Sequence, residues 1–365
     1  MKYKYVPIIK TGNAETKGVN FLDDSIKDTI TPIFELTRSR KTKLSEGPIS
    51  KKLDKIEEIF GATRPFILDL TSDERLLSAE IRSLQDSVDG YKNWRNFLLQ
   101  QKNRFPKIIP MLQIVEDETI SIEENRDNLK KQIEFVASNF NIFFYQNKIT
   151  DDYYGEDLSV VCSMLGKNKI KKLYCCIDSV FINQNKASDV SKKVIERIRD
   201  INQKFNIVNF STAGTSFPKS VSDYSTDDSV TMKLEEVGLW DKVADSIKEK
   251  DLNIIYGDYG SVNQERNDII TSVWIPRIDV PTSDILFYYR KRKGSNTYLS
   301  AYADVARKIV DDLRYKSLNS FIDCWGLEQI EKTSRGEKTG LSPSFWISVR
   351  LNIHLTVQAT LKNAI

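Results

Sequence analysis

Acidic residues and one lysine stand at or near the ends of short apolar runs in this 365-residue sequence. They are Lys10, Glu35, Asp69, Asp178 and Asp258, which follow or close runs such as YVPIIK and FILDL. Carboxylates gathered around an amine can perform general acid–base chemistry, with the lysine orienting an anionic substrate. We therefore take these five residues as the candidate catalytic set.

The same residues allow two other interpretations. Hard divalent cations prefer oxygen ligands, so the four acids could hold Mg²⁺ or Mn²⁺. Salt bridges could instead neutralise the acids without any chemistry, because structural ion networks are common. Arg38, Arg277 and Arg292 are available as counter-charges beside Lys10. The residue types alone name no cofactor, and Mg²⁺ is the one that such acids would accept.

Several other polar features are candidates for ligand binding. Gln113 is the last residue but one of the run KIIPMLQI. The basic loop TRSRKTK (residues 37–43), which contains Arg38, could hold phosphate. The segment KSVSDYSTDDS (residues 219–229) has the composition of a loop that could cover a site. His354 is the only histidine, and no G-x-S-x-G motif accompanies it, which disfavours a hydrolase triad and excludes a histidine-rich zinc site.

Eight apolar runs must position these side chains. They span residues 5–10, 30–36, 65–70, 107–114, 141–146, 172–180, 206–212 and 253–258. Runs that are apolar nearly throughout are typical of parallel strands covered on both faces, and the segments between them have the apolar spacing of helices that pack on a sheet. Eight such units over about 260 residues predict an α/β fold of the (β/α)₈ TIM-barrel-like kind, in which all strand ends share one mouth. An open doubly wound sheet is the alternative, but no glycine-rich phosphate fingerprint follows the first run. A register error of one residue would turn any of these side chains away from the mouth.

The regular alternation stops after Asp258. Residues 273–290 predict two extended pieces around a turn, and helices follow over roughly 299–332. The segment 347–361 alternates as a strand would, but a strand of that length would be unusual, and Ser342-Pro343 suits the start of a closing helix. We predict a TIM-barrel-like domain over residues 1–298, including the extended pieces, and a C-terminal helical elaboration over 299–365 that packs on the barrel.

Composition limits the class of protein. The chain has 54 basic and 51 acidic residues, and a net charge of +3 does not indicate nucleic acid as a partner. The four cysteines lack the spacing of a zinc site or redox pair, which is typical of free thiols in a reducing compartment. No stretch has the length and hydropathy of a signal peptide or a membrane span. We therefore expect a cytoplasmic protein with no membrane association.

Several motifs resemble the beta family of phage and bacterial proteins. They are YVPIIKTG, TPIFEL, FILDL, TAGTSFP, YGDYG, PRIDV and the terminal W-x-S-V-R-L-N-I-H-L-T. The resemblance covers nearly the whole chain and implies a barrel-like fold and an association with phages, prophages and mobile defence loci, but no established reaction. It places the following residues at family-like positions: Lys10, Glu35, Asp69, Asp178, Ser216, Phe217, Pro218, Asp258, Tyr259, Arg277, Trp346, Arg350 and His354. Ile353 stands where a second histidine, adjacent to His354, would be expected.

These observations predict a protein of phage–host conflict, either antiviral or phage-encoded. Its polar mouth would bind an anionic ligand or a phage or host protein partner. The expected ligand-binding residues are Arg38, Gln113, Ser216, Tyr259, Arg277 and His354. The alternative is a hydrolase or transferase, acid–base or Mg²⁺-dependent, acting on a phosphorylated or nucleotide-like substrate. Because no recognisable nucleophile and base accompany the acids, the sequence slightly favours binding and does not decide whether the protein is an enzyme.

Overall fold

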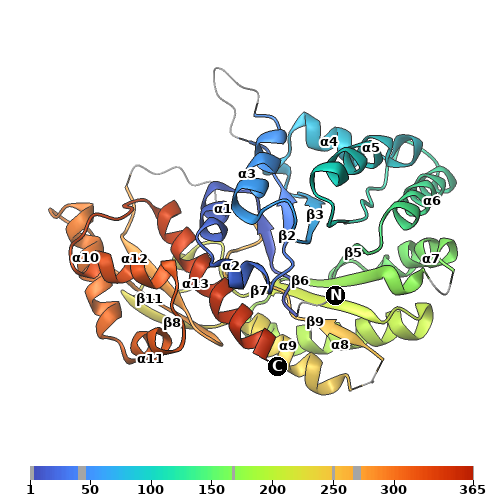
Figure 1. The fold of residues 1–365 in the computed structure, drawn as a ribbon. Coiled ribbons are helices and arrows are strands. Elements are labelled where there is room, and N and C mark those ends of the chain that lie inside the picture. Colours follow the sequence, from blue (N-terminus) through green and yellow to red (C-terminus); the bar gives the residue numbers. More distant parts are fainter. Residues whose placement is uncertain (1–3, 40–46, 167–168, 249–250, 266–272, 365) are drawn as a thin grey trace.

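A ring of parallel strands forms the larger part of the molecule. The computed structural model describes residues 4–39, 47–166, 169–248, 251–265 and 273–364 (Figure 1). The ring consists of β1 (Ile8–Lys10), β2 (Ile33–Leu36), β3 (Phe66–Leu70), β4 (Ile108–Pro110), β5 (Phe143–Lys148), β6 (Leu173–Phe181), β7 (Asn209–Thr215) and β9 (Asn253–Ile255). Each of these strands overlaps one of the eight predicted apolar runs.

Two bridges close the ring. The strands pair in parallel in the orders β1-β2-β3-β4 and β5-β6-β7-β9. Parallel bridges between Met111 and Phe144, and between Tyr5 and Tyr256, join these two sheets at both edges. The backbone N–H of Val6 also donates to the carbonyl of Tyr256 at 2.8 Å. The predicted TIM-barrel-like fold is confirmed by this topology.

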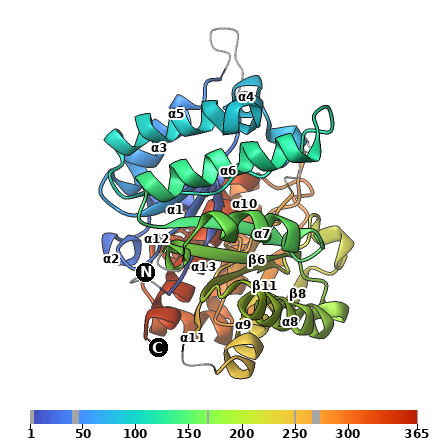
Figure 2. The same cartoon turned by 90° about the vertical axis from the view of Figure 1, so that its right-hand side faces the viewer.

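Helices cover the outside of the barrel (Figure 2). They are α1 (Asn13–Asn20), α2 (Asp24–Lys27), α3 (Ser50–Phe60), α4 (Ala79–Gln85), α5 (Val88–Arg104), α6 (Ile122–Asn139), α7 (Tyr154–Met164), α8 (Ala187–Phe205) and α9 (Glu235–Ser246). Short 3₁₀ turns are η1 (Glu74–Leu76), η2 (Ile170–Lys172), η3 (Gln184–Lys186) and η4 (Val221–Asp223). The apolar faces of the helices join the outward strand side chains in one large buried cluster, whereas the barrel interior forms a separate cluster.

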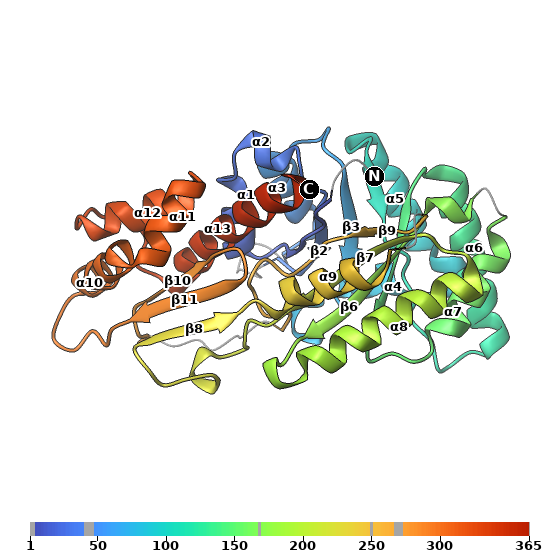
Figure 3. The same cartoon turned by 90° about the horizontal axis from the view of Figure 1, so that it is seen from below.

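A second lobe lies beside the barrel (Figures 1 and 3). Its antiparallel sheet has the order β10-β11-β8, with strands β8 (Ser229–Lys233), β10 (Arg277–Pro281) and β11 (Ile285–Arg290). Its helices are α10 (Tyr298–Asp311), α11 (Leu313–Phe321) and α12 (Trp325–Ser334), and it has its own apolar cluster. The sequence groups the extended pieces within 273–290 with the barrel. In the structure they are β10 and β11, which pair with each other, and β11 also pairs with β8, a strand inserted after β7. Within the described ranges, no helix is long and apolar enough to cross a membrane.

Helix α13 (Pro343–Ala364) joins the second lobe to the barrel. Its N-terminal half packs in the core of the second lobe, and the Asn352 amide donates to the carbonyl of Gly18 in α1 at 3.1 Å. Near its C-terminal end, Lys362 forms an ion pair of 3.6 Å with Asp241 in α9. Helix α13 thus lies between α1 and α9, where a barrel of this kind has its eighth helix. The closing helix expected over 347–361 is part of it.

Gly257 lies in the seam where β9 meets β1 and β7, and we expect its replacement by alanine to destabilise the protein. A Cβ atom there would lie 2.4 Å from the carbonyl oxygen of Thr212 and 2.6 Å from that of Val6. Because both neighbours are backbone atoms, Gly257→Ala should lower the free energy of unfolding by about 2 to 3 kcal/mol in urea titration. Gly238 in α9 is the control, since a Cβ there meets nothing within 4 Å. Gly238→Ala should stabilise by about 1 kcal/mol, and equal effects at the two positions would contradict the close approach at the seam.

Candidate functional site

The mouth of the barrel is built by the inward side chains that follow the interior apolar layer. Ile8, Ile33 and Ile67 are in register on β1, β2 and β3, and they belong to the cluster inside the barrel. Two residues further along each strand, the same inward face presents Lys10, Glu35 and Asp69. Because side chains alternate along a strand, these three polar groups lie side by side above the apolar layer. The register brings together three of the five residues in the candidate catalytic set.

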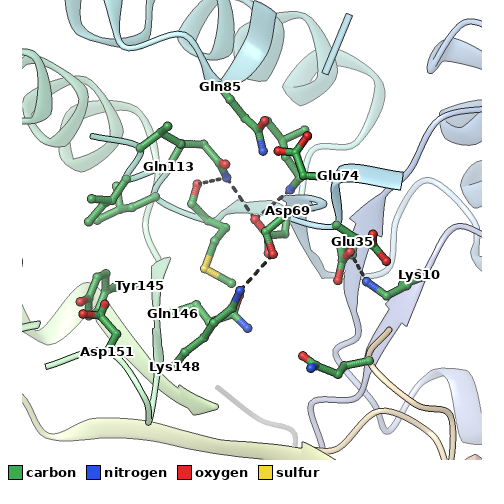
Figure 4. Close-up of a pocket in the computed structure, with 18 of the residues that line it drawn as sticks. Lys10, Glu35, Asp69, Glu74, Gln85, Gln113, Tyr145, Gln146, Lys148 and Asp151 are labelled. Carbon is green, nitrogen blue, oxygen red and sulfur yellow. Dashed lines mark hydrogen bonds and ion pairs between the residues drawn. The ribbon is translucent and has the colours of Figure 1, made fainter. Parts of the chain in front are cut away.

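A cavity of about 570 Å³ opens at this mouth (Figure 4). Lys10 forms an ion pair with Glu35, and both side chains are nearly buried, with 12% and 11% exposure. Gln113 follows β4 and donates from its amide to Asp69 at 3.1 Å. The side-chain amide of Gln132 in α6 accepts a hydrogen bond from the Gln113 backbone N–H at 2.9 Å and donates one to the Gln113 carbonyl at 2.8 Å. The helix layer therefore positions the amide that contacts Asp69.

Asp69 is the most perturbed acid that lines this cavity. Burial, and to a smaller extent the nearby charge of Glu35, raise the pKa of Asp69 to about 7. Hydrogen bonds from Gln113 and the Leu70 backbone act in the opposite direction. Asp69 thus retains its proton close to neutral pH, while the adjacent Glu35 is held in an ion pair. Two carboxyl groups in such different environments can act as an acid and a base on one ligand.

Asp178 lies below the opposite side of the mouth, fully buried. It accepts hydrogen bonds from the Tyr259 hydroxyl at 2.6 Å and the Gln146 amide at 2.9 Å, and both donors line the cavity. Burial raises the pKa of Asp178, and the hydrogen bond from Tyr259 opposes this increase. Asp178 therefore positions Tyr259 and Gln146, which are the groups that a ligand would meet.

Asp258 does not reach the mouth, contrary to expectation. Strand β9 and its extension direct Ile255 and Tyr259 inward, so the intervening Asp258 points outward into the helix layer. Its carboxylate accepts hydrogen bonds from Tyr5 at 2.8 Å, Tyr256 at 2.7 Å, His354 at 2.7 Å and the Gly260 backbone at 2.8 Å. Burial would raise the pKa of Asp258, but the charge and hydrogen bond of His354 lower it below its usual value.

The remaining predicted residues lie apart from the cavity at the mouth. His354 in α13 is fully buried between Asp258 and Ser261, and the Ser261 hydroxyl lies 2.6 Å from the Nδ1 atom of His354. Arg38 is exposed after β2, and residues 40–43 of its basic loop lie outside the described residues. Ser216 donates to Glu236 at the start of α9 at 2.6 Å. Arg277 pairs with Asp279 in the second lobe at 2.7 Å. Of the six expected ligand-binding residues, Gln113 and Tyr259 line the mouth.

Loop residues complete the cavity and were not predicted from the sequence. Asp73, Glu74 and Arg75 follow β3, Lys148 is the last residue of β5, and Asp151 follows it. The only sequence signal for them was their position directly after a predicted strand. Among the described lining residues, six acids face three basic side chains. This charge balance favours an uncharged or cationic ligand over an anionic one in this cavity.

The arrangement does not fit a divalent cation held by all four acids. Asp258 points away, and Asp178 and Glu35 are occupied by Tyr259 and Lys10. Across the ranges that the structure describes, no group of three or more His, Cys, Asp or Glu side chains is placed to hold a metal ion. We therefore assign no step to Mg²⁺.

Comparisons with known proteins give one family and a set of distant structures. A family model described as Beta protein matches residues 5–360. The chain is 27% identical over 368 residues to Protein beta of Enterobacteria phage P4, covering 100% of this chain and 95% of that protein. Among solved structures, it is similar to fungal beta-1,4-galactanases, with 10% identity, a TM-score of 0.44, and coverage of 70% of this chain and 89% of theirs. It is also similar to triosephosphate isomerase from Bartonella henselae, with 8% identity, a TM-score of 0.31, and coverage of 72% and 94%. Neither structural likeness carries an argument about activity.

Proposed function

This chain belongs to the Beta protein family, and we propose that its barrel mouth is the binding site for a small, uncharged, hydroxyl-rich ligand. The observation that carries the proposal is the buried Asp69 on the wall of a cavity of about 570 Å³, since its pKa of about 7 keeps a large share of the carboxyl protonated up to neutral pH. A protonated carboxyl donates and accepts hydrogen bonds, as a ligand hydroxyl does. Binding sites of this size usually place a few such polar groups on a largely preformed wall.

Other groups on the wall support the same ligand chemistry. Gln85, Gln113 and Gln146 each present an amide with both donor and acceptor atoms. Tyr259 adds ring surface to the wall, and its hydroxyl is held by Asp178. Amides and hydroxyls that both donate and accept suit a sugar or polyol, whereas the excess of acids would repel a phosphate.

The setting that we propose is conflict between phages and their hosts, as the sequence predicts. Its support is the full-length similarity to a protein of phage P4. In this setting the mouth would recognise a small molecule made or altered during infection. A phage or host protein that docks at the mouth is the other partner proposed from the sequence, and blocking the cavity would affect both.

Thermal unfolding with added ligands tests the proposal. Neutral mono- and disaccharides should raise the melting temperature, since a ligand at 100 times its Kd adds about 2.7 kcal/mol of stability. Gln146 lines the cavity and is half-buried, so Gln146→Trp should fill the space and remove this increase. Glu74→Gln is the matched control, because Glu74 lines the same cavity but is 73% exposed and pairs with Arg82. The proposal fails if no neutral ligand shifts the melt, or if the shift survives Gln146→Trp.

General acid catalysis is the second candidate, favoured by the different environments of Asp69 and Glu35. Asp69 would donate its proton to a leaving group, and Glu35 would accept one from water or a hydroxyl. It differs from the hydrolase or transferase alternative predicted from the sequence in its substrate, which is neutral here and phosphorylated or nucleotide-like there. It retains the acid–base mechanism and leaves out the metal.

A further inference from the structure

A second cavity, of about 710 Å³, lies between the barrel and the second lobe. Its walls include the first turn of α1, residues 217–222 after β7, strand β10, and the first two turns of α13. Side chains from residues 262–265 and 274–275, from β11 and from α10 complete them. Lys10 and Glu265 line both cavities, so the two cavities meet at the rim of the barrel. The segment 219–229, which has the composition of a covering loop, contributes to this wall and continues into β8.

The charge of this second cavity is opposite to that of the mouth. Its described lining residues include the five basic side chains Lys10, Lys219, Arg277, Arg290 and Arg350, against the three acids Glu15, Glu265 and Asp279. Glu265 is engaged by Lys219, at 2.5 Å. The lining thus has an excess of positive charge, which attracts anions into a partly enclosed space.

Two arginines share one buried carboxylate at the centre of this wall. Arg350 from α13 donates to Asp279 at 2.7 Å, and the Arg277 guanidinium contacts the same carboxylate at 2.7 Å. Arg350 and Asp279 are only 2% and 4% exposed. The Nε of Arg350 has no hydrogen-bond partner among the described residues. A buried guanidinium is stabilised when its charge and its N–H donors have partners. Arg350, together with Arg277, can therefore donate hydrogen bonds to a further anionic oxygen.

Aromatic side chains frame the two arginines. The Arg350 guanidinium lies 3.8 Å from the centre of the Phe217 ring. Trp346, one turn earlier on α13, stacks on Tyr302 with ring centres 5.2 Å apart, and its indole N–H has no partner in the described part of the chain. All four side chains line the cavity. These rings are 7% exposed or less and pack on Arg350 and on one another, so they hold the guanidinium in place and give the cavity apolar edges against which a planar ring can pack.

We propose that this cavity binds an anionic group, a carboxylate or a phosphate, carried on a planar aromatic body, with Arg277 and Arg350 as its cationic contacts. The start of α13, at Pro343 and Ser344, lies on the same wall and adds the positive end of a helix dipole. This site is separate from the neutral-ligand site at the mouth. The sequence predicts an anionic ligand, and the positive charge of this cavity favours such a ligand here.

Isothermal titration tests this site with four probes. Adenosine monophosphate and benzoate both carry a ring and an anion, whereas adenosine and inorganic phosphate each carry one part. We expect one or both complete probes to bind, and the isolated parts to bind more weakly. If adenosine monophosphate binds and benzoate does not, the anion is a phosphate, and the opposite result identifies a carboxylate. If neither complete probe binds, the proposal is overturned.

Variants locate the binding. Arg277→Gln should weaken it about tenfold or more, because a charge-assisted hydrogen bond is lost. The variant should fold, since the Arg277 side chain is 28% exposed and the Arg350–Asp279 pair remains. Arg307→Gln is the control in the same lobe, 56% exposed and paired with Asp304. Gln146→Trp should also leave this binding unchanged, because Gln146 lines only the mouth cavity. Equal binding by Arg277→Gln and Arg307→Gln would overturn the proposal.

Discussion

Asp69→Asn is expected to stabilise the protein at pH 8, by up to about 4 kcal/mol, although it alters the centre of the candidate site. The pKa of Asp69 rises from 3.8 to about 7 on folding, and each unit corresponds to about 1.4 kcal/mol. Above pH 7 the folded protein must hold a buried charge that asparagine does not carry. Functional sites often reduce stability in this way, so a stabilising substitution here would indicate a site kept for function.

The pH dependence gives this prediction its sign. Between pH 4 and 7 the folded state binds more protons at Asp69 than the unfolded state does, so stability falls as the pH rises through this range. Asparagine does not titrate. The gain in the free energy of unfolding from Asp69→Asn should therefore be near zero at pH 4 and reach its full size above pH 7. Urea unfolding of both proteins from pH 4 to pH 8 measures the difference. Glu74→Gln should stay within about 0.5 kcal/mol throughout, because its carboxylate is mostly exposed.

The same variant tests the catalytic candidate. If Asp69 donates a proton, release of nitrophenol from neutral nitrophenyl glycosides should fall as the pH rises through about 7. Asp69→Asn should abolish this release while the protein remains folded. Turnover that is unchanged in Asp69→Asn would rule out the acid role. If Asp69→Asn were instead less stable than the unmodified protein at pH 8, the raised pKa of Asp69 would be contradicted.

Asp258→Asn is expected to destabilise the protein by about 4 kcal/mol at pH 7. The Asp258 carboxylate is fully buried, and breaking a buried, hydrogen-bonded ionic cluster typically costs about 3 to 5 kcal/mol. Here the carboxylate holds His354 of α13 and two tyrosines at the seam between β9 and β1. With the Gly260 backbone N–H there are four donors, and an amide offers them only one oxygen. Denaturant unfolding measures the loss, and a change below 1 kcal/mol would show that the cluster is not needed for closure.

Acid lability should accompany this loss. Because the pKa of Asp258 is lowered in the folded protein, its contribution is present above about pH 4 and disappears as the pH falls through the folded pKa. Asp258→Asn should therefore lack that part of the acid destabilisation. Asp241→Asn provides the control, since Asp241 pairs with Lys362 on the same helix but is 58% exposed. It should unfold as the unmodified protein does, within about 0.5 kcal/mol.

The barrel could be predicted from the sequence because its strands are buried on both faces. Each strand is an apolar run, and Lys10, Glu35 and Asp69 share the inward parity of the isoleucines before them. Asp258 does not follow this pattern, because its side chain points outward. In YGDYG the two tyrosines flank Asp258 and are equally apolar, yet Tyr256 packs outside the barrel and Tyr259 inside, with the short β9 ending at Ile255. Nothing in the residue types distinguishes these two faces.

The second lobe depends on pairings that local patterns do not indicate. Strand β8 is short and mostly exposed, and it becomes a strand only through pairing with β11, more than 50 residues later. Helix α13 shows no helical apolar stripe because residues 348–359 are all buried. The buried arginine pair joins β10 to α13, and its two residues are 73 positions apart in the sequence. The second cavity was therefore not predicted as a unit.

Helix α13 also sets the order in which the molecule can be completed during its synthesis. A ribosome delivers β1 and α1 first, but the helix that covers the gap between α1 and α9 emerges only after the whole second lobe. Until then one side of the nascent barrel is uncovered, and its tyrosines and apolar strand faces are exposed to chaperones or to other chains. The cavity between the lobes likewise takes shape only when α13 has docked, so binding at that site requires that α13 has been synthesised and packed.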